Sequence, residues 1–270
     1  MAIRYELDAH VATITIERPH RRNALDLEHW FELAAAWRRF RDEGAARVAI
    51  VTGAGGAFCA GADLKDFAPL LTRSLEEGVT EVDGMPLDCT LEATLRSLPI
   101  YKPIVAAIDG PCVAGGMELL GGTDIRVASE RAIFGVMEPK RGMVAGGGTT
   151  VRLPRQLAWP AAMEILLTAD TFDAERALRL GLVNEVVPQA ELVDRARGWA
   201  TRIAANSPLA TAATKESALR GLQADSFERA LEFEYELAGQ VQMSADAVEG
   251  ARAFVEKREP VWSEPLGKKI

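Results

Sequence analysis

Hydrophobic and polar positions alternate at the start of the chain and then change period. Ile3, Tyr5 and Leu7 stand at every second position, and residues 11–16 continue the alternation, which predicts a β-hairpin turning near residues 8–10. From residue 27 the apolar positions recur every three or four residues, as on one face of a helix. Because Asp26 can serve as its N-cap, we predict an amphipathic helix to about residue 43 whose aromatic side chains pack in the core.

Short apolar, β-branched runs farther along predict buried strands. Two of these runs end at Gly53 and Gly110, and further strands are expected from Asp124, at the AIFG segment and from Leu182. Helical patterns separate them, at residues 87–98, 161–167 and 174–180. Alternating strands and helices are typical of an α/β domain.

No strand pattern remains beyond about residue 190. Helices are predicted there at residues 192–205, 208–222, 226–241 and 245–256. We therefore expect an α/β core over residues 1–200 and a helical region over residues 201–270 that serves packing or assembly.

Composition and charge narrow the choice of function. With 270 residues, of which 48% are hydrophobic, the chain can bury a large core and is not a disordered polymer. The 31 basic and 39 acidic residues give a net charge of −8, which argues against nucleic acid or an anionic membrane as the main partner. Three cysteines without a Cys-x-x-Cys pair, no signal segment at the start and no apolar run of about 18 residues predict a reducing, cytoplasmic location.

Several familiar kinds of site are absent from the sequence. The three histidines lie within the first 29 residues and show no metal-binding spacing, which argues against a zinc site or a Ser-His-Asp triad. The glycines after residue 53 fit neither the dinucleotide fingerprint nor the P-loop, because Phe58, Ala62 and Asp63 occupy decisive positions.

Two glycine-containing loops instead resemble one another. Each follows a buried strand, ends in Ala-Gly and leads into a helix: AGGAFCAGADLKD at residues 54–66 and PCVAGGMELLGG at residues 111–122. If the loops converge, Ala62 and Gly115 would each present a backbone N–H to one oxygen, which is the geometry of an oxyanion hole. The alternative is that both are tight turns in which glycine serves only packing.

Two glutamates favour the catalytic interpretation. Glu118 falls in the first turn of the second helix, with its side chain tilted toward the N-terminus, although a glutamate there could simply complement the helix dipole. Glu138 lies among apolar residues, so its pKa is expected to be raised, as a general acid requires.

These segments together resemble the enoyl-CoA hydratase/isomerase (crotonase) superfamily. The resemblance covers nearly the whole chain and rests on FCAGADLK, AGGMEL with DIRVAS, FG-x-x-E, GGGTTVRLPR and A-x-x-A-x-x-x-GLVNEVVP, in this order and spacing. It implies an α/β crotonase-like spiral of ββα units. It also implies a helical C-terminal trimerisation region, and commonly a hexamer built as a dimer of trimers.

The resemblance also implies a reaction. Ala62 and Gly115 would bind the thioester oxygen of an acyl-CoA, Glu118 would deprotonate water and Glu138 would protonate Cα, so that syn addition of water to a trans-2-enoyl-CoA gives a 3-hydroxyacyl-CoA. No metal and no cofactor beyond the coenzyme A of the substrate is implied. Retention of both glutamates favours a hydratase, and the alternatives are a double-bond isomerase or lyase of the same fold and a non-catalytic acyl-CoA-binding homologue. Many relatives have Pro before the second Glu and in the next glycine loop, where this chain has Met137 and Ala145.

Binding of coenzyme A requires local basic groups in an acidic protein. By the resemblance, the candidate contacts are Arg21 and Arg22 in the RPHRR segment, Ala60, Asp63 and Leu64 in CAGADL, and Lys257 near the C-terminus. Lys257 could serve this chain or a neighbouring subunit. The alternative for the RPHRR segment is a solvated turn. Residues 66–87 are predicted to be a long loop that forms the acyl pocket and closes over the substrate. Cys59 and Cys112 are interpreted as packing residues.

Overall fold

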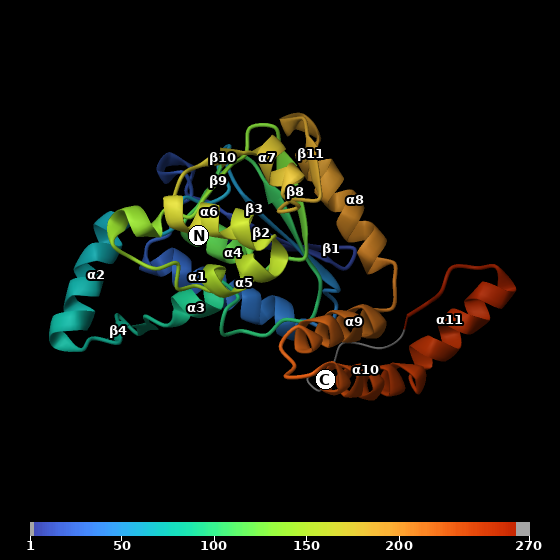
Figure 1. Ribbon diagram of the computed structural model, residues 1–270. Helices are drawn as coiled ribbons and strands as arrows, with labels where there is room; N and C mark the ends of the chain where they lie inside the picture. Colours follow the sequence, from blue (N-terminus) through green and yellow to red (C-terminus); the bar gives the residue numbers. More distant parts are fainter. Residues whose placement is uncertain (1–2, 263–270) are drawn as a thin grey trace.

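The computed structural model describes residues 3–262 and is centred on a six-stranded sheet in the order β1-β2-β3-β6-β8-β11 (Figure 1). The antiparallel hairpin predicted for the N-terminus is confirmed as β1 (Ile3–Asp8) and β2 (Val11–Ile16). All later strands of this sheet run parallel to β2. They are β3 (Val48–Gly53), β6 (Ile104–Ile108), β8 (Ile125–Ser129) and β11 (Glu185–Val187).

A smaller, three-stranded sheet has the order β10-β9-β7. It consists of β7 (Pro111–Val113), β9 (Ile133–Gly135) and β10 (Phe172–Asp173). Strand β9 is the predicted AIFG strand, whereas β7 lies in a segment that the sequence analysis assigned to a loop. Since β6, β7 and the next helix follow one another directly, the chain contains the expected ββα order. A further short pair is β4 (Glu81–Val82) with β5 (Met85–Pro86).

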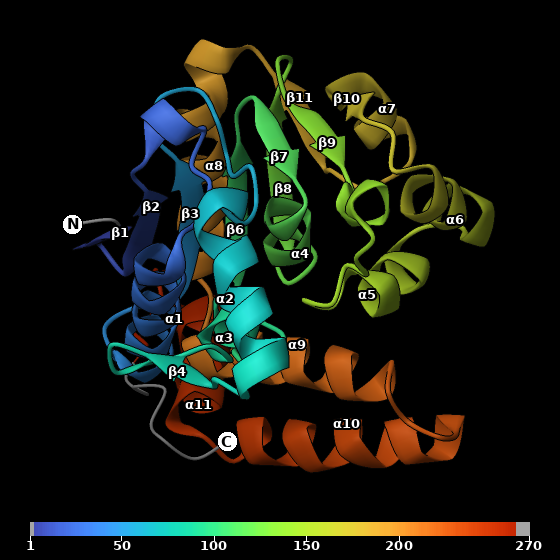
Figure 2. The same ribbon diagram turned by 90° about the vertical axis from the view of Figure 1, so that its left-hand side faces the viewer.

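The helices surround these sheets and form the C-terminal part (Figure 2). They are α1 (Leu27–Asp42), α2 (Leu64–Glu77), α3 (Cys89–Ala93), α4 (Gly115–Leu120), α5 (Thr149–Gln156), α6 (Trp159–Thr168), α7 (Ala174–Arg179), α8 (Leu192–Ala204), α9 (Pro208–Gly221), α10 (Phe227–Gln242) and α11 (Ala245–Glu256). Short 3-10 turns lie at η1 (Pro19–Arg21), η2 (Glu138–Arg141) and η3 (Gln189–Glu191).

Alternate residues of the parallel strands pack on opposite sides of the large sheet. In β3, Val48 and Ile50 belong to the core formed with α8, whereas Ala49 and Val51 belong to the larger core that includes α1. Burial on both faces explains the continuous apolar runs in the sequence. Full burial of a side chain such as Val or Ile contributes about 1.5–3 kcal/mol. The two cores therefore give the loops at the strand ends a rigid support.

Two of the predicted elements are wrong. The loop predicted over residues 66–87 is largely the helix α2, which continues through Pro69 although that residue cannot donate a backbone hydrogen bond. The helix predicted at residues 87–98 is confined to α3, because Leu95 adopts a left-handed conformation with φ of 59° soon after it.

The C-terminal helices are confirmed and leave many apolar side chains uncovered. Helices α10 and α11 extend away from the sheets, on the opposite side of the molecule from α2 (Figure 1). Their exposed apolar residues are Phe227, Leu231, Tyr235, Val248, Phe254 and Val255. Across residues 3–262, no helix combines the length and the apolar character that crossing a membrane would need.

Candidate active site

The two glycine-containing loops, whose convergence the sequence left open, meet beyond the carboxyl ends of β3 and β6. Cys59 and Cys112 form a parallel bridge there, in which the Cys59 N–H donates to the Pro111 oxygen at 3.0 Å. Gly61, with φ of 82°, then passes directly against the start of α4: a Cβ placed on it would lie 2.8 Å from the backbone nitrogen of Gly115. Only glycine permits this approach, which brings the two Ala-Gly segments together.

The backbone N–H of Ala62 is free because Leu25 forms its hydrogen bonds with the residues on either side of Ala62. The Leu25 N–H donates to the Gly61 oxygen and the Asp63 N–H donates to the Leu25 oxygen, both at 2.8 Å. In such a parallel bridge, the N–H of the bridged residue, Ala62, points away from the partner strand. Within residues 3–262 the Ala62 N–H has no hydrogen-bond acceptor.

The N–H of Gly115 is free for a different reason. Gly115 is the first residue of α4, whose first N–H groups have no partner inside the helix. Ala114 before it has φ 50° and ψ −121°, a conformation that costs a residue with a Cβ about 1–3 kcal/mol and is typical of functional sites. The Gly115 N–H also lacks an acceptor among the described residues.

A cavity of about 360 Å³ connects these groups with both glutamates. Ala62 and Gly115 form part of its wall, and Glu118 and Glu138 complete it. Its apolar walls come from α1, α2, α3, β7 and the segment after β9: they include Trp30, Leu64, Phe67, Leu91, Val113, Met137, Met143 and Val144. The structure therefore brings all four residues of the predicted centre to one cavity.

Glu118 is held by the glycine run that follows η2. One of its carboxylate oxygens accepts a hydrogen bond from the Gly147 N–H. Burial raises the pKa of Glu118, while the Gly147 N–H and the guanidinium of Arg152 act in the opposite direction. Arg152 donates to the Thr94 oxygen at 2.9 Å and to the Leu95 oxygen, and so fixes the segment after α3 beside Glu118.

Glu138 is more deeply buried, with 8% of its surface exposed. Burial raises its pKa to about 7, and the nearby Glu118 contributes in the same direction, which confirms the raised pKa expected from its apolar surroundings. One carboxyl oxygen is buried without any hydrogen-bond partner in the part of the chain that the structure describes. Met137, where this chain departs from the common pattern, is the N-cap of η2 directly before Glu138, and Glu138 still lines the cavity.

A second, smaller cavity of about 160 Å³ adjoins the first. The two share Trp30, Phe67 and Thr90 as walls. The rest of the second cavity is mainly apolar, with Leu25, Leu27, Leu70, Leu71 and Leu87 beside Asp26 and Ser74. Sequence analysis assigned Trp30 to core packing alone; it is buried, yet its Nε1–H has no partner within residues 3–262 and it lines both cavities.

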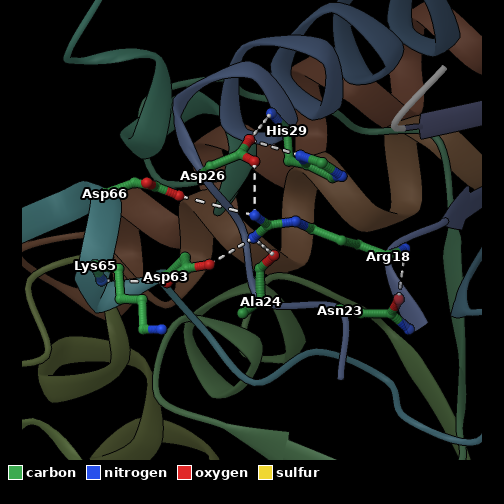
Figure 3. Close-up of polar contacts among 8 residues, drawn as sticks. All are labelled: Arg18, Asn23, Ala24, Asp26, His29, Asp63, Lys65 and Asp66. Atoms are coloured by element: carbon green, nitrogen blue, oxygen red, sulfur yellow. Dashed lines mark hydrogen bonds and ion pairs between the residues drawn. The ribbon is translucent and has the colours of Figure 1, made fainter. Parts of the chain in front are cut away.

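The RPHRR segment divides into two kinds of residue. Arg18 is nearly buried and forms ion pairs with Asp26 and Asp63 (Figure 3). Arg21 and Arg22 are exposed at η1, and neither guanidinium forms a hydrogen bond or ion pair with the described residues. The prediction that these two contact coenzyme A therefore stays a prediction.

The remaining residues predicted to contact coenzyme A differ in their position relative to the larger cavity. Ala60 and Leu64 line the larger cavity. Asp63 does not: its carboxylate caps α2 at the Lys65 N–H and binds Arg18. Its contact with coenzyme A stays a prediction. Lys257 is the C-cap of α11 and lines neither this cavity nor the smaller one beside it.

The buried cysteines fit a packing role. Burial raises the pKa of Cys59 to about 12 and that of Cys112 well above its ordinary value, so both remain thiols. Among residues 3–262, no three His, Cys, Asp or Glu side chains are grouped so that they could hold a metal ion.

Comparison with solved structures defines the class of fold. An enoyl-CoA hydratase from Mycobacterium tuberculosis H37Rv superposes with a TM-score of 0.85 at 38% identity, covering 97% of this chain and 98% of that one. An enoyl-CoA hydratase from Bacillus anthracis gives a TM-score of 0.88 at 33% identity, with 97% and 99% covered. The protein has the crotonase fold.

Sequence comparison then identifies the family. The family model described as Enoyl-CoA hydratase/isomerase matches residues 6–265. Enoyl-CoA hydratase EchA19 of Mycobacterium tuberculosis is 39% identical over 94% of both chains, and (E)-benzylidenesuccinyl-CoA hydratase of Thauera aromatica is 38% identical over 97% of this chain and 99% of its own. The chain belongs to the enoyl-CoA hydratase/isomerase family.

Proposed function

We propose that this protein is an enoyl-CoA hydratase, a hydro-lyase that adds water to a trans-2-enoyl-CoA to give a 3-hydroxyacyl-CoA. The observation that carries the proposal is that one cavity holds two free N–H groups, of Ala62 and Gly115, together with two carboxyl groups, of Glu118 and Glu138. Relatives with names of this kind match nearly the whole chain.

The two N–H groups form the oxyanion hole. The thioester oxygen of the substrate accepts hydrogen bonds from Ala62 and Gly115, and negative charge grows on this oxygen when water attacks Cβ. Donors that are already in place stabilise the enolate more than the neutral thioester, and loss of one such donor typically costs about 3–4 kcal/mol in the transition state.

The two glutamates move the protons. Glu118 takes a proton from water while the water oxygen bonds to Cβ, and the electron pair of the double bond passes into the enolate. Burial raises the pKa of Glu138 to about 7, so this group is protonated below that pH and gives its proton to Cα. The proton held on Glu118 must return to Glu138 before the next turnover, and since the two groups interact they titrate as a pair.

The remaining walls bind the rest of the substrate. Ala60 and Leu64 border the thioester, and the exposed guanidinium groups of Arg21 and Arg22 attract the phosphates of coenzyme A. The apolar second cavity receives the acyl tail, with α2 as its outer wall. The proposed reaction uses two backbone N–H groups, two glutamates and water, with no cofactor beyond the coenzyme A of the substrate.

The uncovered apolar residues of α10 and α11 support an assembly role for residues 201–270, distinct from the α/β core of residues 1–200. We propose a homotrimer or a dimer of trimers, in which Lys257 contacts a coenzyme A phosphate of a neighbouring copy. The proposed location is the cytoplasm.

The test follows the absorbance of the conjugated enoyl thioester, with one short and one long trans-2-enoyl-CoA. Loss of absorbance with the wild-type protein, strongly slowed in both Glu118→Gln and Glu138→Gln, supports hydration. No turnover of either substrate by folded wild-type protein would overturn the proposal.

A further inference from the structure

Arg18 binds the loop of residues 54–66 that carries the Ala62 N–H (the oxyanion loop). Its Nη1 donates to Asp63 at 2.8 Å and to the Ala24 oxygen at 2.9 Å (Figure 3). Its Nη2 lies 3.1 Å from Asp26 and 3.8 Å from Asp66. Only 13% of the Arg18 side chain is exposed, so this arginine is committed to the protein rather than to a ligand in solvent.

These contacts reach both strands of the bridge that frees the Ala62 N–H. The Ala24 oxygen belongs to the same peptide group as the Leu25 N–H, which donates to the Gly61 oxygen. Asp63, on the other strand, donates its own N–H to the Leu25 oxygen. One planar guanidinium therefore binds the Ala24–Leu25 peptide group on one strand and the side chain of Asp63, the residue after Ala62, on the other. A guanidinium is suited to such a fork of acceptors.

The position of Arg18 is fixed in turn by a buried asparagine. The Arg18 N–H donates to Asn23 Oδ1 at 2.8 Å. The Asn23 side chain is fully buried and donates to the oxygens of Ala54 and Ala57 at 2.9 and 2.6 Å. The arginine is thus anchored to the loop that follows β3.

The pKa shifts of the carboxyl groups around Arg18 agree with close ion pairs. Burial alone would raise the pKa of Asp63, yet the Lys65 N–H and the Arg18 guanidinium bring it below its ordinary value. Asp26, which caps α1 at the His29 N–H, likewise has a lowered pKa, with burial opposed by His29 and Arg18. Arg18 therefore links the N-terminal ends of α1 and α2 to the oxyanion loop.

We propose that Arg18 is a positioning residue for the oxyanion hole: it keeps the bridge between Leu25 and Ala62 in register, so that the Ala62 N–H stays aimed at the thioester oxygen. The inference rests on the proposed function, because it takes Ala62 to be one of the two donors. Disorder in the bridge would weaken the hydrogen bond in the transition state more than it weakens binding of the coenzyme A part.

The test compares Arg18→Met and Arg18→Lys with Lys215→Met. Lys215 is a matched control because 11% of its side chain is exposed and it binds Asp124 and the Lys102 oxygen, away from the cavity. Two quantities are measured on protein shown to be folded by circular dichroism. They are kcat and KM for hydration, and the shift of the thioester carbonyl band when the saturated, unreactive butyryl-CoA binds.

We expect Arg18→Met to lower kcat by about 10- to 100-fold with a change in KM below about 3-fold, and to reduce the carbonyl shift. Arg18→Lys should recover part of both, and Lys215→Met should keep both. A wild-type kcat and carbonyl shift in Arg18→Met, or equal losses in Lys215→Met, would overturn the inference.

Two further measures keep the test decisive. If Arg18→Met does not fold, Asp63→Asn replaces it, because asparagine caps a helix as well as aspartate but removes the ion pair. A wild-type carbonyl shift in Asp63→Asn would overturn the inference. The carbonyl shift needs no turnover, so it tests Arg18 even if the wild-type protein failed to hydrate and the proposed function fell.

Discussion

The Glu118 carboxylate occupies the space that a side chain on Gly147 would need. A Cβ built on Gly147 would lie 2.5 Å from Oε2 and 2.6 Å from Cδ of Glu118, while the Gly147 N–H donates to Oε1. Glycine at this position therefore both admits and orients the carboxylate.

Replacement of Gly147 should disturb Glu118 without unfolding the protein. We expect Gly147→Ala to lower kcat by about 10- to 100-fold, because general acid–base catalysis depends on the placement of the base. Gly146→Ala is the comparison, since its Cβ would meet nothing closer than the Val144 oxygen at 3.7 Å, and its loss should be much smaller. Equal rates for the two variants would contradict this role of Gly147.

The pH profile should report the glutamate pair. Because burial raises the pKa of Glu138 to about 7 and the acid must be protonated, kcat/KM should fall as pH rises through about 7. Loss of activity at low pH should reflect protonation of Glu118. In Glu138→Gln, the residual rate should lack the alkaline fall; a wild-type profile in this variant would contradict the assignment.

Glu138 should also make the fold less stable at alkaline pH. A carboxyl whose pKa is raised in the folded state contributes stability that is complete below its unfolded value of 4.5 and is lost as pH rises through about 7. The free energy of unfolding of Glu138→Gln should therefore exceed that of the wild type by about 1–2 kcal/mol at pH 8, allowing for partial solvent contact, and the difference should vanish near pH 4. Denaturant titration at both pH values measures it.

Filling the second cavity should change chain-length preference. Leu70→Trp is expected to lower kcat/KM for a trans-2-decenoyl-CoA by about tenfold or more while crotonyl-CoA is affected little, because only the longer tail reaches this cavity. Leu75→Trp is the control on the same helix, with Leu75 78% exposed and outside both cavities. Parallel losses for both substrates in Leu70→Trp would contradict a separate tail cavity.

Much of the fold was predictable because its signals are local. Continuous apolar runs marked the parallel strands, and N-cap residues such as Asp26 marked helix starts. The failures come from contacts outside those patterns. The helix α2 continues through Pro69 in a stretch predicted to be a loop, and the left-handed Leu95 ends a periodic stretch that the sequence alone would extend.

The site was predictable where the backbone dictates it. The repeated strand, loop and helix start led to Ala62, Gly115 and Glu118, and apolar surroundings marked Glu138. What the sequence concealed depends on distant partners. In the sequence, Arg18 is one member of a basic cluster. In the structure it is held by Asp26, Asp63 and Asp66, which lie 8, 45 and 48 positions away along the chain.

The most direct test of the central claim is the product formed from crotonyl-CoA in oxygen-18-labelled water, identified by mass spectrometry. We expect a product heavier than the substrate by one labelled water, with the label on C3, and a rate lowered by about 100-fold or more in both Glu118→Gln and Glu138→Gln. A product of unchanged mass, or hydration that persists at the wild-type rate in either variant, would contradict the account.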